Sequence, residues 1–323
     1  MEHREALGEK VDAKQVADAL IRLMPCITME SLYMPGCKKG KNADKEKDAS
    51  KDNEVGIVEK AFQKLSLEEE LACLAYYKTC IVERDKEILK IKMKQSIYLR
   101  EKVIRKRETK FVESFPFYFV SPDLILYDFE IRFAGGNHLL EKWPKLQLKL
   151  LSLLNKKEAE ECADFGFDGM MTSFFILLRA LSMKKSFATN VDKLIVYSDN
   201  INGSPDNLIV KKNIHPYIIA VGPKKNDISN YYIDVEEHLI PIPNGFNSLK
   251  VIDMLFKCHK VFHLQYNPAY VKLMHFIDYF VFDDKENAEI DVTVSMRKIS
   301  EKLNVSELNE RAINPALEEV NRD

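Results

Sequence analysis

The spacing of the apolar residues changes near residue 194, and this change limits the possible folds more than any other feature. Short runs rich in β-branched and aromatic residues follow at 194–197, 208–210, 217–221, 230–235 and 238–242, as is typical of strands. The last three runs are joined by too few residues for helical crossovers, so they predict an antiparallel meander. Helical spacing returns at 248–263 and 268–282. We therefore expect an α+β fold that is mostly helical, with a small central antiparallel sheet.

Start and stop signals predict the helices that precede the sheet. Ser66 and Glu69 have the spacing of a capping box, and we expect one long helix from there to about residue 112. Ser121, which is followed by a proline and an acid, predicts a helix that ends at the glycine pair 135–136. A short helix from Asn137 is expected to end before Pro144, and an apolar helix covers about 168–183.

Composition divides the chain into five segments. Residues 1–35 contain a short amphipathic pattern at 11–24, and residues 36–54 carry six lysines and five acids but no large apolar side chain. A segment of the second kind buries too little surface to offset its ordering entropy, so we expect a disordered charged linker there. We expect a helical region at 55–112, an α+β globular domain at 113–283 and an acidic C-terminal tail at 284–323, with one short helix from Asn314.

Sequence signals for export, membranes and cofactors are lacking. No apolar run reaches the ~18 residues that a membrane-spanning helix needs, and the N-terminus lacks the apolar stretch of a signal peptide. The six cysteines form no CxxC pair, so neither a zinc ribbon nor a thioredoxin-type site is indicated. We expect free thiols, a nuclear or cytoplasmic protein, no cofactor and no membrane contact.

Basic charge is concentrated between residues 84 and 110. Eleven Lys or Arg residues stand there against four acids, a local balance of +7 in a chain whose net charge is −2. Concentrated positive charge attracts polyanions, and each neutralised phosphate releases counterions. The side chains expected to contact nucleic acid, without sequence readout, are Lys90, Lys92, Lys94, Arg100, Lys102, Arg105, Lys106 and Arg107. A solvated helix face is one alternative, and pairing of helix 66–112 with a protein partner or with itself is another.

Three histidines are weak candidates for metal ligands. His259 and His263 are four residues apart on a predicted helix, a spacing that can present two imidazoles to one metal ion. His275, on the next predicted helix, would be the third ligand. Histidines that merely pack in a core helix give the same pattern, so both interpretations stay open.

Carboxylates give only faint signals for catalysis. Asp123 and Glu130 are followed by Arg132 where a restriction-type nuclease needs a lysine, and arginine cannot act as a base. A metal-dependent nuclease-like protein is therefore a remote alternative. Asp234 and Glu236 share one face near a predicted hairpin tip, which we interpret as a solvated turn.

Aromatic and apolar positions form a longer pattern in four stretches: 115–119, 138–144 (HLLEKWP), 215–222 (HPYIIAVG) and 261–280 (VFHLQYNPAYVKLMHFIDYF). In these stretches the chain resembles a group of uncharacterised animal proteins that are abundant in insect and other invertebrate genomes. Some of those proteins carry a SAM or zinc-finger module. The resemblance covers roughly residues 110–283 and implies a mobile-element origin and a nuclear role, without an established activity. Together with the basic run, it predicts a non-enzymatic nuclear binding protein.

Overall fold

The computed structural model describes residues 65–106, 110–133, 136–199, 207, 209, 214–285 and 291–305. The chain divides into two compact units. We call them the helical unit (Met1–Thr109 with Glu113–Phe115) and the mixed unit (Lys110–Val112 with Pro116–Asp323). The expected segments 1–35 and 36–54 and the short helix from Asn314 lie outside the described residues, as does nearly all of the expected strand at 208–210.

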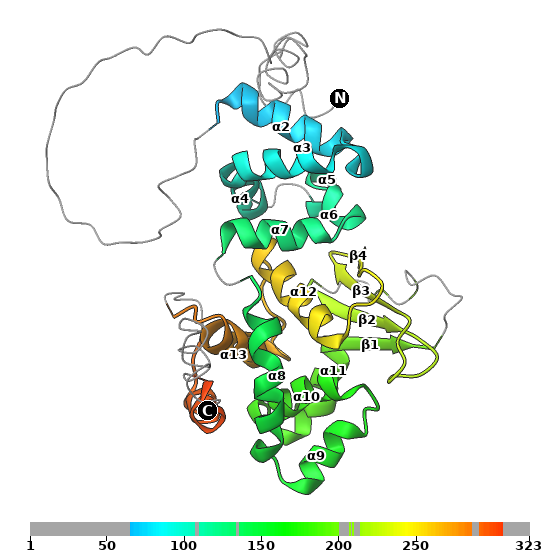
Figure 1. Ribbon diagram of the computed structural model, residues 1–323, viewed down its shortest axis with the longest axis vertical. Helices are drawn as coiled ribbons and strands as arrows, with labels where there is room; N and C mark the ends of the chain where they lie inside the picture. The colour runs from blue at the N-terminus through cyan, green and yellow to red at the C-terminus, as the bar shows by residue number, and fades with distance from the viewer. Residues whose placement is uncertain are drawn as a thin grey trace, which may run out of the picture. The chain divides into compact units, whose positions relative to one another are not determined.

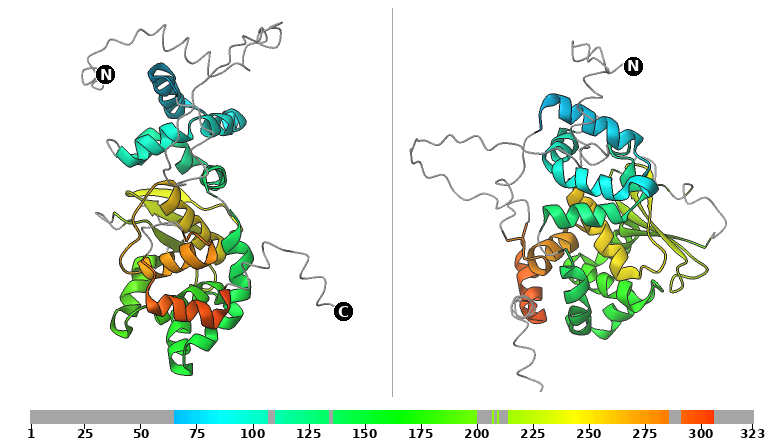
Figure 2. Two further views of the ribbon diagram at one scale, coloured as in Figure 1. Left: turned by 90° about the vertical axis from the view of Figure 1, so that its left-hand side faces the viewer. Right: turned by 45° about the horizontal axis from the view of Figure 1, so that its top comes forward.

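Over residues 65–106, the described part of the helical unit contains three helices where the sequence predicted one. They are α2 (Leu67–Thr79), α3 (Val82–Gln95) and α4 (Ile97–Lys106), and the two turned views in Figure 2 show them grouped together. The short helix α5 (Phe111–Ser114) lies at the division between the units. The predicted capping box is confirmed: the Glu69 amide donates to Ser66 Oγ at 3.3 Å, and the Ser66 amide donates to Glu69 Oε2 at 2.8 Å.

The expectation of one continuous helix over 66–112 is wrong, because a straight rod would leave the apolar faces of all three helices in water. The chain breaks at Cys80, whose ψ of 140° is extended. It then kinks at Ser96, whose hydroxyl donates back to the Lys92 carbonyl at 2.7 Å. The break lets α2 fold against α3 and α4, so that the Tyr77 hydroxyl reaches the Ser96 hydroxyl.

Helices make up most of the mixed unit (Figure 1). Those before the sheet are α6 (Phe117–Val120), α7 (Asp123–Arg132), α8 (His138–Leu150), η3 (Leu151–Leu153), α9 (Lys156–Ala163), α10 (Gly169–Leu181), η4 (Lys184–Ser186) and α11 (Phe187–Leu194). Those after it are α12 (Ser248–Val261), α13 (Val271–Phe276), the π-helix η6 (Ile277–Val281) and α14 (Val294–Leu303). Within the described part of the chain, none of the helices is both long enough and apolar enough to cross a bilayer.

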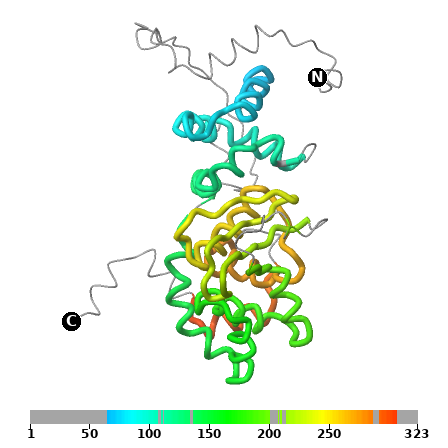
Figure 3. Tube along the Cα trace, turned by 90° about the vertical axis from the view of Figure 1, so that its right-hand side faces the viewer, coloured from blue at the N-terminus to red at the C-terminus, as the bar shows by residue number. Residues whose placement is uncertain are grey.

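The sheet has four strands in the order β1-β2-β3-β4, which Figure 3 traces as neighbouring segments. They are β1 (Ile195–Ser198), β2 (Tyr217–Val221), β3 (Asn230–Val235) and β4 (His238–Pro241). The last three form the predicted antiparallel meander, with Ile218 opposite Ile233 and Ile233 opposite Ile240. β1 pairs parallel to β2, so the sheet is mixed and the expectation of a wholly antiparallel sheet is wrong at this edge. The connection between Ser198 and Tyr217 is long enough to return the chain to the same end of the sheet.

Helix α12 is the centre of the core and lies against the sheet (Figure 1). It contacts β2, α7, α8 and α10, and most of its side chains are buried. At its first residue the Ser248 hydroxyl donates to Asp168 and lies 3.1 Å from the Tyr231 hydroxyl of β3. Asp168 in turn accepts the Met171 amide at 2.8 Å and caps α10. A chain of polar contacts therefore joins the starts of two core helices to the sheet.

Helix α8 does not stop at Pro144 as the sequence predicted. The side chains of Leu139, Trp143, Leu146 and Leu150 are buried at helical spacing on both sides of the proline. Burial of that continuous stripe offsets the backbone hydrogen bond that proline removes. Trp143 also stacks on Phe174, with ring centroids 3.8 Å apart.

The expected tail at 284–323 is not wholly a tail, because it contains α14. The Thr293 hydroxyl accepts the Met296 amide at 3.3 Å and caps this helix. The side chains of Met296 and Leu303 are fully buried, and the Lys149 ammonium donates to the Leu303 carbonyl at 3.0 Å. The sequence did not predict α14, because its apolar stripe has only a few residues and the segment around it is rich in acids.

Candidate functional site

Two of the eight cations predicted to contact nucleic acid lie inside the helical unit. Lys92 is buried, and its ammonium lies 5.0 Å from the centroid of the Tyr76 ring. Arg100 is fully buried, and its guanidinium donates to the Met93 carbonyl and, at 3.0 Å, to the Ser96 hydroxyl. A cation buried in this way cannot reach a phosphate unless the helices around it separate. We therefore remove Lys92 and Arg100 from the predicted interface.

The other cations predicted to contact nucleic acid differ in their ion pairs and in their exposure to solvent. Lys102 pairs at 2.6 Å with Glu70, whose side chain is nearly buried. The next two cations form exposed pairs within one helix, namely Lys90 with Glu87 at 3.1 Å and Arg105 with Glu101 at 3.6 Å. Lys94 and Lys106 are exposed, and Arg107 lies outside the described residues. Lys90, Lys94, Arg105 and Lys106 thus remain as the accessible set.

An aromatic side chain accompanies these exposed cations. Tyr98 is 48% exposed; it follows Lys94 by four residues and precedes Arg105 by seven. The second spacing, within α4, places Tyr98 and Arg105 on the same side of that helix, whereas Lys94 belongs to α3 on the other side of the kink at Ser96. The surface of α3 and α4 therefore offers positive groups for phosphates and one ring for stacking on a base.

The three candidate metal-ligating histidines do not converge. His259 is buried, and desolvation lowers its pKa to about 3, so its imidazole is neutral. His263 Nε2 lies 3.0 Å from the Arg132 guanidinium. The Tyr266 ring contacts both other histidines, with its centroid 4.8 Å from that of His259 and 5.6 Å from that of His275. Over the described ranges, no group of three or more His, Cys, Asp or Glu side chains could hold a metal ion.

A charged network lies next to these histidines. The Lys260 ammonium donates to both carboxylate oxygens of Asp278, at 2.9 and 3.1 Å, and to Asp284 at 3.1 Å. The Tyr266 hydroxyl also donates to Asp278 at 3.1 Å. Desolvation raises the pKa of Asp278, while Lys260 opposes that shift. The network joins α12 to the π-helix η6, and each of its charged groups already has a partner within it, so we assign it a structural role.

Asp234 was interpreted from the sequence as part of a solvated turn, and the structure corrects this. Its side chain is buried in β3, opposite Tyr217 in the sheet register. Burial raises its pKa to about 6, although the Tyr217 side chain opposes the shift. Glu236 and Glu237 form the turn itself, with φ of 55° and 66°. The carboxylates therefore do not gather into a metal-binding pair.

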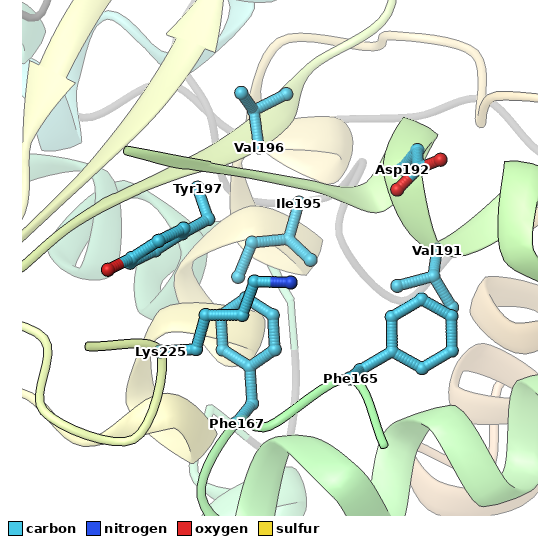
Figure 4. A pocket seen from close by; sticks show the side chains of 8 residues that line it. All are labelled: Phe165, Phe167, Val191, Asp192, Ile195, Val196, Tyr197 and Lys225. Atoms are coloured by element: carbon cyan, nitrogen blue, oxygen red, sulfur yellow. The ribbon is translucent and has the colours of Figure 1, made fainter. Parts of the chain in front are cut away.

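A cavity of about 400 Å³ lies beside the edge strand β1 (Figure 4). Four parts of the chain line it: the segment between α9 and α10, the end of α11, β1 itself, and the loop between β2 and β3. The lining side chains are Phe165, Phe167, Val191, Asp192, Ile195, Val196, Tyr197 and Lys225. Most of the lining residues are apolar or aromatic, as in many small-molecule pockets, although polar atoms supply about half of the surface exposed in the cavity.

Lys225 is the cation of this cavity. Its Nζ lies 5.6 Å from the centroid of the Phe167 ring and 5.8 Å from that of the Tyr197 ring. The loop that carries it turns tightly over Gly222, where a Cβ atom would lie 2.3 Å from the Asp227 carbonyl oxygen. Tyr197 is held in turn by its hydroxyl, which donates to the Gly222 carbonyl at 2.9 Å.

Sequence reasoning missed this cavity because its parts are distant along the chain. The β2–β3 loop lacks the spacing of a phosphate-binding loop, so its local sequence does not mark it as part of a site. The paired aromatics Phe165 and Phe167, on either side of a glycine, were the one local signal, since exposed turns seldom carry two rings.

No family model matches the sequence, and no curated protein and no solved structure matches it either. The resemblance to uncharacterised animal proteins therefore stays a prediction.

Proposed function

We propose that this chain is a non-enzymatic binding protein of the nucleus or cytoplasm whose helical unit contacts nucleic-acid phosphates without reading the sequence. The observation that carries the proposal is the accessible set on α3 and α4, which has an exposed tyrosine beside it. The set is smaller than the sequence predicted: Lys90, Lys94, Arg105 and Lys106.

These cations lie at the surface of α3 and α4, where a phosphate can approach them. The pairs of Lys90 and Arg105 are exposed and lie within one helix, and such pairs contribute only about 0.3–0.5 kcal/mol. Contact of four cations with duplex DNA gives a slope of about −3.6 for log affinity against log salt. Affinity should then fall about 150-fold between 50 and 200 mM salt, which is well above the error of a binding titration.

The test is fluorescence-anisotropy titration of the full chain with random duplex DNA, single-stranded DNA and RNA at those two salt concentrations. The charge-reversal variant replaces three exposed cations by glutamate: Lys94, Arg105 and Lys106. The matched control reverses three exposed lysines of the mixed unit: Lys156, Lys157 and Lys185. We expect the first variant to reduce the salt slope to about −1 and the control to keep it, because only the first removes phosphate contacts. No binding at 50 mM salt, or equal loss in both variants, would overturn the proposal.

A second candidate function is supported by the outer face of α2. Leu67 is 61% exposed, Ala75 is exposed, and Leu71 and Leu74 are only half-buried, although the opposite face of the helix packs inward. A helix that is apolar on both faces is usually covered on both. We propose self-association through this face as the alternative, and sedimentation at low and high salt separates the two functions. Dimers that persist at high salt and are lost in Leu67→Glu would favour the alternative, whereas a monomer at all salt concentrations would exclude it.

A further inference from the structure

The proposed contact with nucleic acid concerns the helical unit and makes no use of the cavity beside β1. We propose that this cavity, lined by Phe165, Phe167, Tyr197 and Lys225, binds a small planar molecule that carries a carboxylate or phosphate group. The apolar walls would hold the plane of the ligand, and the lysine ammonium would hold its charge.

The two phenylalanines of the cavity wall pack against a second layer of rings. Phe165 packs against Phe175 and Phe187, with ring centroids 5.5 and 5.6 Å apart, and Phe167 packs against Phe175 at 5.7 Å. This second layer of rings fixes the first, so little side-chain entropy is lost on binding. The volume of about 400 Å³ lies near the small end of ligand pockets, which favours a ligand of one or two rings.

The positive charge of Lys225 favours a ligand that carries a negative charge. Among the described residues no carboxylate forms an ion pair with Lys225, whose ammonium is instead placed over two rings. An anionic group can pair with that ammonium while the apolar part of the ligand contacts lining residues that Lys225 does not cover, namely Phe165, Val191 and Ile195. A cationic ligand would need the ring faces that Lys225 already covers, and like charges would repel.

Asp192 is the one acidic residue of the lining, and its position limits its effect. It lies on α11 at the rim and is exposed to solvent, so water and salt screen its repulsion of an anion. Figure 4 shows the Lys225 side chain reaching across the cavity beside Phe167, whereas Asp192 lies above Val191. The cation is therefore the polar group closest to the aromatic walls.

Isothermal titration calorimetry of the full chain with two matched pairs of probes tests the proposal. The pairs are indole-3-acetate with indole-3-acetamide, and adenosine 5′-monophosphate with adenosine, so that carboxylate and phosphate are tested separately. We expect at least one anionic probe to bind tenfold or more tightly than its uncharged partner. Lys225→Met should abolish that preference, because methionine keeps the length of the side chain without its charge. Lys224→Met, on the same loop, is the matched control and should leave the preference unchanged.

Three results would overturn the proposal: no binding of any probe at millimolar concentration, equal binding of charged and uncharged partners, or a preference that survives Lys225→Met. Lys225→Gln is a second variant that keeps a polar end group, and circular dichroism checks the fold of each variant. The outcome is independent of the nucleic-acid proposal, because the four accessible cations of the helical unit are unchanged in every protein used.

Discussion

Asp234→Asn should stabilise the protein at neutral pH and have less effect at lower pH. Asp234 is only 1% exposed, and desolvation raises its folded pKa to about 6, against an unfolded value of about 3.9. A raised folded pKa means that the protonated form is favoured in the fold. The contribution of the protonated carboxyl group to stability is complete below the unfolded pKa and is lost as the pH rises through the folded pKa. Asparagine keeps the shape of the side chain and removes the charge.

The size of the effect follows from the two pKa values. One pKa unit corresponds to about 1.36 kcal/mol. Relative to a carboxyl group that stays protonated, the ionisation of Asp234 therefore lowers the free energy of unfolding by about 2.8 kcal/mol at pH 7.5 and by about 1.5 kcal/mol at pH 5. Both carboxylate oxygens are buried without a hydrogen-bond partner among the described residues, so removal of the charge should make the variant more stable than the natural chain by about 2 kcal/mol at pH 7.5. The difference should shrink by about 1 kcal/mol on going to pH 5.

Urea unfolding followed by tryptophan fluorescence measures this difference, since Trp143 is the single tryptophan of the sequence and is fully buried. Taking the difference between the two proteins cancels the pH dependence of all other groups. Asp227→Asn, at an exposed position in the loop between β2 and β3, is the control and should show no such trend. A variant that is less stable at pH 7.5, or a difference that does not change with pH, would refute the view that desolvation dominates at Asp234.

Three further changes test the packing of the mixed unit by the same unfolding assay. Gly222→Ala should destabilise it by about 2 kcal/mol or more, because the new Cβ would lie 2.3 Å from the Asp227 carbonyl oxygen and force the flanking hairpin bonds apart. Lys257→Met should cost about 3–5 kcal/mol, because it leaves the carboxylate of Asp253, now 2.6 Å from the ammonium, buried without its partner. Leu303→Ala should cost about 2–5 kcal/mol, because the side chain is fully buried on α14.

Each of these three changes has a control and a contradictory outcome. Gly169→Ala should be nearly neutral, since only the Gln147 amide lies near its Cβ, and equal effects at both glycines would contradict the clash at Gly222. Adding Asp253→Asn to Lys257→Met should restore part of the lost stability, and no recovery would contradict the ion-pair argument. A neutral Leu303→Ala would show that α14 is not part of the folded core.

Local signals in the sequence were sufficient for much of the secondary structure. The runs at 217–221 and 230–235 predicted β2 and β3 residue for residue, because alternation and β-branched content act within a few neighbouring positions. The capping box at Ser66 was predicted for the same reason, since its two hydrogen bonds join residues three apart. Helix α12 was also predicted, because its apolar residues are dense and regular.

Tertiary structure alone decided where the long helix breaks and which cations are exposed. Composition counted Lys92 and Arg100 as surface charge, but α2 folds back over them, and no local pattern reveals that return. The direction of β1 likewise depends on the path of the chain between Ser198 and Tyr217, not on the strand itself. The cavity around Lys225 needs residues from positions 165 to 225 to meet at one edge of the sheet. Helical periodicity and capping depend on residues that are close along the chain, so the sequence predicts them. Burial, strand direction and the lining of a cavity depend on residues that are close only in the folded structure, so the sequence alone does not reveal them.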